Sequence, residues 1–178
     1  GARGVALLSE RGRGANFFRG EVSERGFPLY FPAAFLLKST PAFLALLALA
    51  LVAGGVRLTR RGRRGPPREV ALAVLLPLAV AGLYFLSSMR SSFNIGARHL
   101  LPVWALATFG AAVVAGRWLA SRPRVRAAGG FLLAASAAGS LVSAGASPIA
   151  WFNPLAGGPE GGRAWFSDSN VDWGQDLY

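Results

Sequence analysis

Four long apolar stretches occupy the middle of the chain, and short polar segments separate them. Each stretch has close to the ~20 residues that an α-helix needs to cross a ~30 Å hydrocarbon core. The pattern therefore predicts an all-α, polytopic transmembrane bundle. The predicted spans are about 31–53, 70–88, 100–119 and 127–146.

Prolines and small residues give these spans local features. Ser39-Thr40-Pro41 is typical of a helix start, with a hydroxyl cap and proline in the first turn. It predicts a short interfacial helix before Pro41 and a span from Pro41 onward; the alternative is one long helix kinked there. In the fourth span, Ala135, Gly139 and Ser143 recur every four residues, which predicts close packing against a neighbouring helix.

The charge distribution orients the predicted spans. The chain carries a net charge of +11, and arginines gather between the first two spans and again between the last two. Basic loops stay on the cytoplasmic side. Segment 1–29 and segment 147–178 are therefore expected outside the cell, flanking a transmembrane region over 30–146.

The arginine-rich loops have another interpretation, which is nucleic-acid binding. We disfavour it because the loop over 57–68 lies directly between two spans and lacks interleaved aromatic residues. Topology and anionic membrane lipids explain the charge. Membrane lipids and not nucleic acid are therefore the expected partners. The absence of cysteine excludes disulfides and thiol chemistry, and the sequence has no phosphate-binding loop and no nucleophile motif.

Three cationic side chains are predicted at the outer membrane face. Lys38 is the only lysine, and Arg98 and His99 open the third span. They are either interfacial anchors that reach the headgroups or ligands for a lipid phosphate, which an arginine binds through two N–H groups. A lone histidine does not make a metal site, so no metal is predicted.

The C-terminal segment is dense in polar residues. Acidic and amide side chains alternate as in the start of a calcium loop, but the glycine required at the sixth position is Trp173 here. Two interpretations stay open: contact with an acceptor such as a sugar, or a structural cap over the helices. The residues concerned are Asp168, Asn170, Asp172, Trp173, Gln175 and Asp176.

Three stretches together resemble the membrane-embedded GT-C glycosyltransferases of family 39, the group related to protein mannosyltransferases. The first is Phe18-Arg19-Gly20-Glu21 with Tyr30-Phe31-Pro32 and Lys38-Ser39-Thr40-Pro41; relatives have a lysine-threonine-proline step, without Ser39. The second is Asn94-Ile95-Gly96-Ala97-Arg98-His99-Leu100-Leu101-Pro102. The third joins Phe152-Asn153 and Ala156-Gly157-Gly158-Pro159 to Asp168-Ser169-Asn170-Val171-Asp172-Trp173-Gly174-Gln175-Asp176-Leu177.

The resemblance implies transfer of a sugar from a polyprenyl-phosphate donor to an acceptor on the external face of a bacterial plasma membrane, with inversion at the anomeric carbon. It implies that Lys38, Arg98 and His99 contact the carrier phosphate. The family's catalytic aspartate would lie upstream of residue 1, so this chain is expected to be the C-terminal part of the membrane domain and inactive alone. The sugar, the acceptor and any need for a divalent metal stay open.

Two other classes remain open. A transporter or flippase of lipid-linked sugars would also need a cationic outer rim, but it should carry ionisable groups at mid-membrane, and the predicted spans hold almost none. A non-catalytic scaffold subunit would bind its partners through the small residues of the fourth span.

Overall fold

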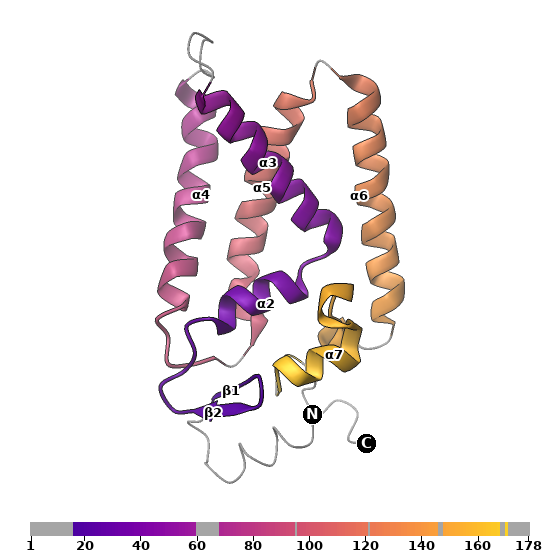
Figure 1. Ribbon diagram of the computed structural model, residues 1–178. Coiled ribbons are helices and arrows are strands. Elements are labelled where there is room, and N and C mark those ends of the chain that lie inside the picture. Colours follow the sequence, from indigo (N-terminus) through magenta and orange to yellow (C-terminus); the bar gives the residue numbers. More distant parts are fainter. Residues whose placement is uncertain are drawn as a thin grey trace. The chain divides into compact units, whose positions relative to one another are not determined.

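The computed structural model describes residues 16–59, 68–94, 96–120, 122–145 and 148–167, and Asn170. Helices dominate this part of the chain, with one small β-hairpin (Figure 1). The elements are β1 (Asn16–Phe18), β2 (Glu21–Ser23), α2 (Tyr30–Lys38), α3 (Pro41–Thr59), α4 (Arg68–Ser88), η1 (Ala97–Leu100), α5 (Leu101–Trp118), α6 (Pro123–Ala144), η2 (Pro148–Ala150), η3 (Pro154–Ala156) and α7 (Gly158–Trp165).

The chain forms two compact units. The loop-rich unit comprises Gly1–Ser39, Phe85–Leu100 and Gly139–Tyr178, and the helical unit comprises Thr40–Tyr84 and Leu101–Ala138. The loop-rich unit contains the hairpin, α2, the 3-10 turns and α7. Its residues come from three distant parts of the sequence, so long-range contacts hold it together.

The hairpin corrects the all-α prediction for the N-terminal segment. Strands β1 and β2 are antiparallel with Phe18 opposite Glu21, so Arg19 and Gly20 alone form the turn. Both have positive φ, 53° and 88°, as the tight turns that match strand twist require. Three-residue strands are too short for an alternating pattern to be visible in the sequence, which is why it was missed.

The described residues contain two helices long and apolar enough to cross a membrane. These are Ala97–Trp118, which joins η1 to α5, and Pro123–Ala144, which is α6. The consecutive pair α2 and α3 makes a third candidate if it acts as one span, and Leu72–Ser88 of α4 is a shorter apolar helix. The prediction of a mostly helical protein with membrane-length helices is thus confirmed at this coarser level.

The first apolar run divides at the predicted place. Helix α2 ends at Lys38 and α3 begins at Pro41. The Thr40 Oγ1 accepts a hydrogen bond from the Phe43 amide at 3.2 Å, which caps the N-terminus of α3. The predicted cap and proline start are therefore confirmed, and the run forms two helices in place of one helix kinked at Pro41.

In the helical unit, α3 packs against α5 (Figure 1). The buried face of α5 consists largely of small residues, and a Cβ at Gly110 would lie 2.6 Å from Leu78 of α4. The outer surface is rich in exposed leucine, valine and phenylalanine, which suits a lipid environment. Small residues thus bring the helices close together, while large ones face outward.

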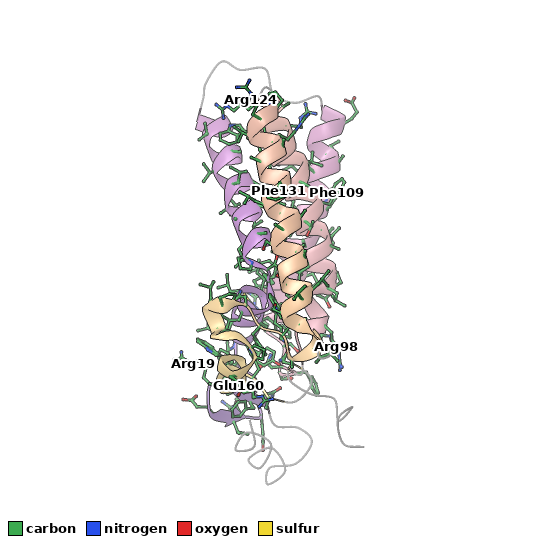
Figure 2. All side chains as sticks on the ribbon, turned by 90° about the vertical axis from the view of Figure 1, so that its right-hand side faces the viewer. Arg19, Arg98, Phe109, Arg124, Phe131 and Glu160 are labelled. Carbon is green, nitrogen blue, oxygen red and sulfur yellow. The ribbon has the colours of Figure 1, made fainter. Side chains whose placement is uncertain are left out.

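The small-residue face of α6 is exposed in the described structure, so its predicted packing against a neighbouring helix stays a prediction. None of the residues of α6 is buried, and Phe131 is 73% exposed (Figure 2). Ala135, Gly139 and Ser143 are all exposed, and a Cβ at Gly139 would meet no atom within 4 Å. The predicted close packing of this face does not occur against any described part of the chain.

Candidate functional site

Aromatic rings form the core of the loop-rich unit. Tyr30 and Phe166 meet edge to face at 5.1 Å, Phe152 stacks on Phe166 at 5.8 Å, and Phe18 lies 5.9 Å from Tyr30. All four are buried. The two C-terminal phenylalanines therefore serve packing, and they offer no exposed platform for a sugar ring.

Four asparagines are buried around this core. Asn16, Asn94, Asn153 and Asn170 are 3%, 4%, 0% and 2% exposed. Together they come from all three segments of the loop-rich unit, since Asn16 lies in the first, Asn94 in the second, and Asn153 and Asn170 in the third. Because a buried amide without hydrogen bonds costs free energy, the partners of these side chains show which segments must lie together.

Asn170 joins three segments. Its Oδ1 accepts from the Ala97 amide at 2.7 Å, its Nδ2 donates to the Tyr30 hydroxyl at 2.5 Å, and its carbonyl accepts from Lys38 Nζ at 2.5 Å. One residue of the C-terminal segment thus bonds to both ends of α2 and to the start of η1.

Asn153 ties the C-terminal segment to the end of α2. Its Nδ2 donates to the carbonyls of Leu36 and Ser39 at 2.7 and 2.8 Å. Its Oδ1 accepts from the amides of Leu155 and Ala156, which caps the 3-10 turn η3. The last carbonyls of a helix have no partners within the helix, so Asn153 satisfies groups at two helix ends at once.

Asn16 and Asn94 hold the hairpin against the segment that follows α4. Asn16 Nδ2 donates to the carbonyls of Ser23 and Ser92 at 3.0 and 2.7 Å, and its Oδ1 accepts from the Asn94 amide at 2.6 Å. Asn94 Oδ1 accepts from the Phe27 amide. The segment before Arg98 is thereby fixed to the N-terminal hairpin.

The Lys38 ammonium points into the loop-rich unit. It donates to the carbonyls of Ile149 and Asn170 and lies 4.0 Å from the centre of the Phe152 ring. An ammonium has three donors, and among the described residues two of them are used by protein carbonyls. Lys38 therefore positions the C-terminal segment as well as offering a charge.

Arg98 and His99 lie on η1, whose other two residues, Ala97 and Leu100, are buried. Both cationic candidates are exposed, and Figure 2 shows Arg98 at the surface. The turn packs against α2, and Asn170 fixes the Ala97 amide. The structure thus brings Lys38, Arg98 and His99 into one compact unit. Asn170 bonds to Lys38 itself and to Ala97, the residue before Arg98.

The remaining predicted residues of the C-terminal motif lie outside the described residues: Asp168, Asp172, Trp173, Gln175 and Asp176. Asn170 is the described member, and it lies in the interior. Within the described ranges, no group of three or more His, Cys, Asp or Glu side chains is placed to hold a metal ion.

Sequence reasoning missed the roles of Asn16, Asn94 and Asn153. For Asn153 a signal was present, because Asn153-Pro154 is typical of a capped turn. Asn16 and Asn94 stand in segments without periodicity, and their partners are 76 and 67 residues away, respectively, in the sequence. No local pattern encodes such contacts.

Comparisons of the chain with protein-family models, with curated proteins and with solved structures find no match. The functional interpretation therefore depends on the residues and their geometry.

Proposed function

We propose that this chain is part of an integral membrane glycosyltransferase that transfers a sugar from a polyprenyl-phosphate carrier to an acceptor on the extracytoplasmic face. One observation carries the proposal. The three sequence stretches that resemble the GT-C group meet at Asn170, which bonds to Tyr30 and Lys38 of the first stretch and to Ala97 of the second. Stretches that act together in one site are expected to converge in this way.

The chemistry of transfer needs fixed positive charge. When a sugar leaves its carrier, negative charge develops on the departing phosphate, and preorganised cations stabilise it. In the proposed function Arg98, His99 and the remaining donor of Lys38 supply this charge. The acidic motif at 168–176 would contact the acceptor or cap the site.

The test is the Arg98→Ala variant in the complete enzyme. Removing one donor from a preorganised anion site typically lowers turnover by about 10²–10³-fold, and we expect a loss of this size. The measurement is the transfer of label from a polyprenyl-phosphate sugar to acceptor in membranes, normalised to the amount of folded protein. Arg124→Ala, which removes an exposed arginine of α6, serves as the matched control and should retain activity.

Equal turnover of the Arg98→Ala variant and the parent enzyme would remove Arg98 from the site. A product in which the sugar crosses the membrane while still attached to its carrier would instead favour the flippase class. The assay therefore has to identify the sugar covalently bound to acceptor.

Helix α6 favours a second function, association with another membrane helix. Its face of small residues is exposed in the described structure, and such faces let helix backbones approach closely in lipid.

We expect Gly139→Leu to weaken association by roughly tenfold without destabilising the chain, because no atom lies within 4 Å of the added Cβ. Energy transfer between labelled proteins in micelles measures it. Ala137→Leu, on the opposite side of the same helix, is the matched control, and equal weakening by both would contradict a specific face.

A further inference from the structure

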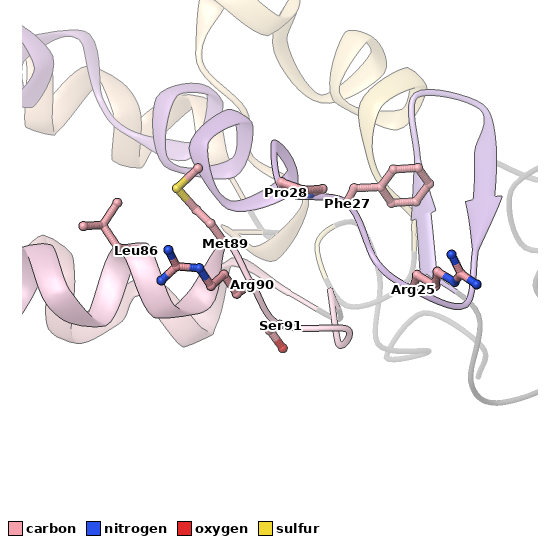
Figure 3. A pocket seen from close by; sticks show the side chains of 7 residues that line it. All are labelled: Arg25, Phe27, Pro28, Leu86, Met89, Arg90 and Ser91. Carbon is pink, nitrogen blue, oxygen red and sulfur yellow. The ribbon is translucent and has the colours of Figure 1, made fainter.

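A pocket of about 390 Å³ opens in the loop-rich unit between the hairpin and the end of α4. Arginines stand on both sides of it: Arg25 follows β2, and Arg90 follows α4 (Figure 3). Phe27 and Pro28 lie between them in the view, and Leu86 and Met89 line the side of α4. None of Lys38, Arg98 and His99 lines this pocket.

The two arginines are not neutralised by acids in the described structure. The one ion pair there joins Arg163 to Glu160 at 3.5 Å. Arg25 and Arg90 are both exposed, and no carboxylate of the described residues lies within 4 Å of their guanidinium nitrogens. Two uncompensated cations on an apolar pocket complement a ligand that is anionic at one end and apolar at the other.

The position of the pocket identifies the source of such a ligand. Arg90 comes two residues after Ser88, the last residue of the apolar helix α4. The end of a membrane helix lies at the level of the lipid headgroups, where guanidinium groups meet phosphates. A phosphodiester there carries its acyl chains toward the apolar helix, where Leu86 and Met89 lie.

We propose that this pocket binds the headgroup of an anionic phospholipid, with its phosphodiester at Arg90, Arg25 at the opposite rim and the start of an acyl chain against Leu86 and Met89. The site goes beyond the proposed sugar transfer, since it uses none of the residues assigned to the carrier. A bound lipid would link the hairpin to α4, two segments distant in sequence.

The test is lipid retention by the purified chain in detergent, measured by native mass spectrometry with phosphatidylglycerol and phosphatidylcholine. The parent chain is expected to retain phosphatidylglycerol at least tenfold more strongly, and Arg25→Gln with Arg90→Gln should lower that retention by about tenfold or more. Arg19→Gln with Arg163→Gln removes the same charge from exposed positions of the loop-rich unit that do not line the pocket, and should leave retention unchanged.

Equal retention of the two lipids by the parent chain, or equal retention of phosphatidylglycerol by the Arg25/Arg90 double variant, would overturn the proposal. Displacement of the lipid by glycerol phosphate at equal concentration would also overturn it, because the pocket would then select a free phosphate. If the double variant loses helix content, the two single variants are measured, each with an expected loss of about threefold. Neither outcome depends on whether the complete protein transfers sugar.

Discussion

Replacing Asn153 by alanine is expected to lower the free energy of unfolding of the loop-rich unit by about 2–4 kcal/mol. The substitution removes two donors from the carbonyls of Leu36 and Ser39 and one acceptor shared by the amides that begin η3. These groups lie in an interior position, since Asn153 is fully buried, and water does not replace the lost bonds. Thermal or denaturant unfolding in detergent, followed by tryptophan fluorescence, measures the loss.

Asn153→Asp sharpens the test because it preserves shape and changes only the chemistry. A carboxylate keeps the acceptor for η3 but cannot donate to the two α2 carbonyls, and it places a charge among carbonyl oxygens. We expect the aspartate variant to be less stable than the alanine variant. If both variants unfold like the parent chain, Asn153 does not hold α2 and η3 together.

Gly162→Ala is expected to destabilise the same unit by about 3 kcal/mol, at the upper end of typical overpacking costs. A Cβ at this position of α7 would lie 2.1 Å from Phe152 Cδ2, well inside van der Waals contact. Phe152 has no free direction in which to move, because it stacks on Phe166 and lies beneath the Lys38 ammonium. The added methyl group therefore forces the ring, and with it the position of the lysine, to shift.

Gly130→Ala provides the control for this substitution. Gly130 lies in α6, where an added Cβ meets no atom within 4 Å, and alanine is the better helix former by about 1 kcal/mol. The control should unfold at an equal or higher temperature than the parent chain. A Gly162→Ala variant that matches the control would show that α7 can move away from Phe152 at little cost.

Features with a local cause could be predicted from the sequence. The start of α3 was predictable because a hydroxyl residue and a proline act within one turn. The membrane-length helices were predictable because hydrophobic length is a property of a single segment. The hairpin was not, because its signal amounts to Arg19-Gly20 between two strands of three residues.

The site was predictable only in part. Lys38, Arg98 and His99 were identified because all three fall at the predicted outer ends of apolar runs. The sequence could not show that Asn170 bonds to Tyr30, Lys38 and Ala97. Tyr30 and Lys38 are 140 and 132 residues away from it in the chain. The packing of α6 stays a prediction, because a small-residue face identifies a helix that can be approached closely but does not identify the partner helix.

The buried asparagines have a consequence for how the loop-rich unit responds to its surroundings. Amides do not titrate, so acidification or a change in salt leaves the hydrogen bonds of the four asparagines with the same donors and acceptors. A network built from carboxylates would lose its acceptors when the surroundings turned acidic. The asparagines thus let the loop-rich unit keep its internal connections when the pH or the salt concentration around it changes.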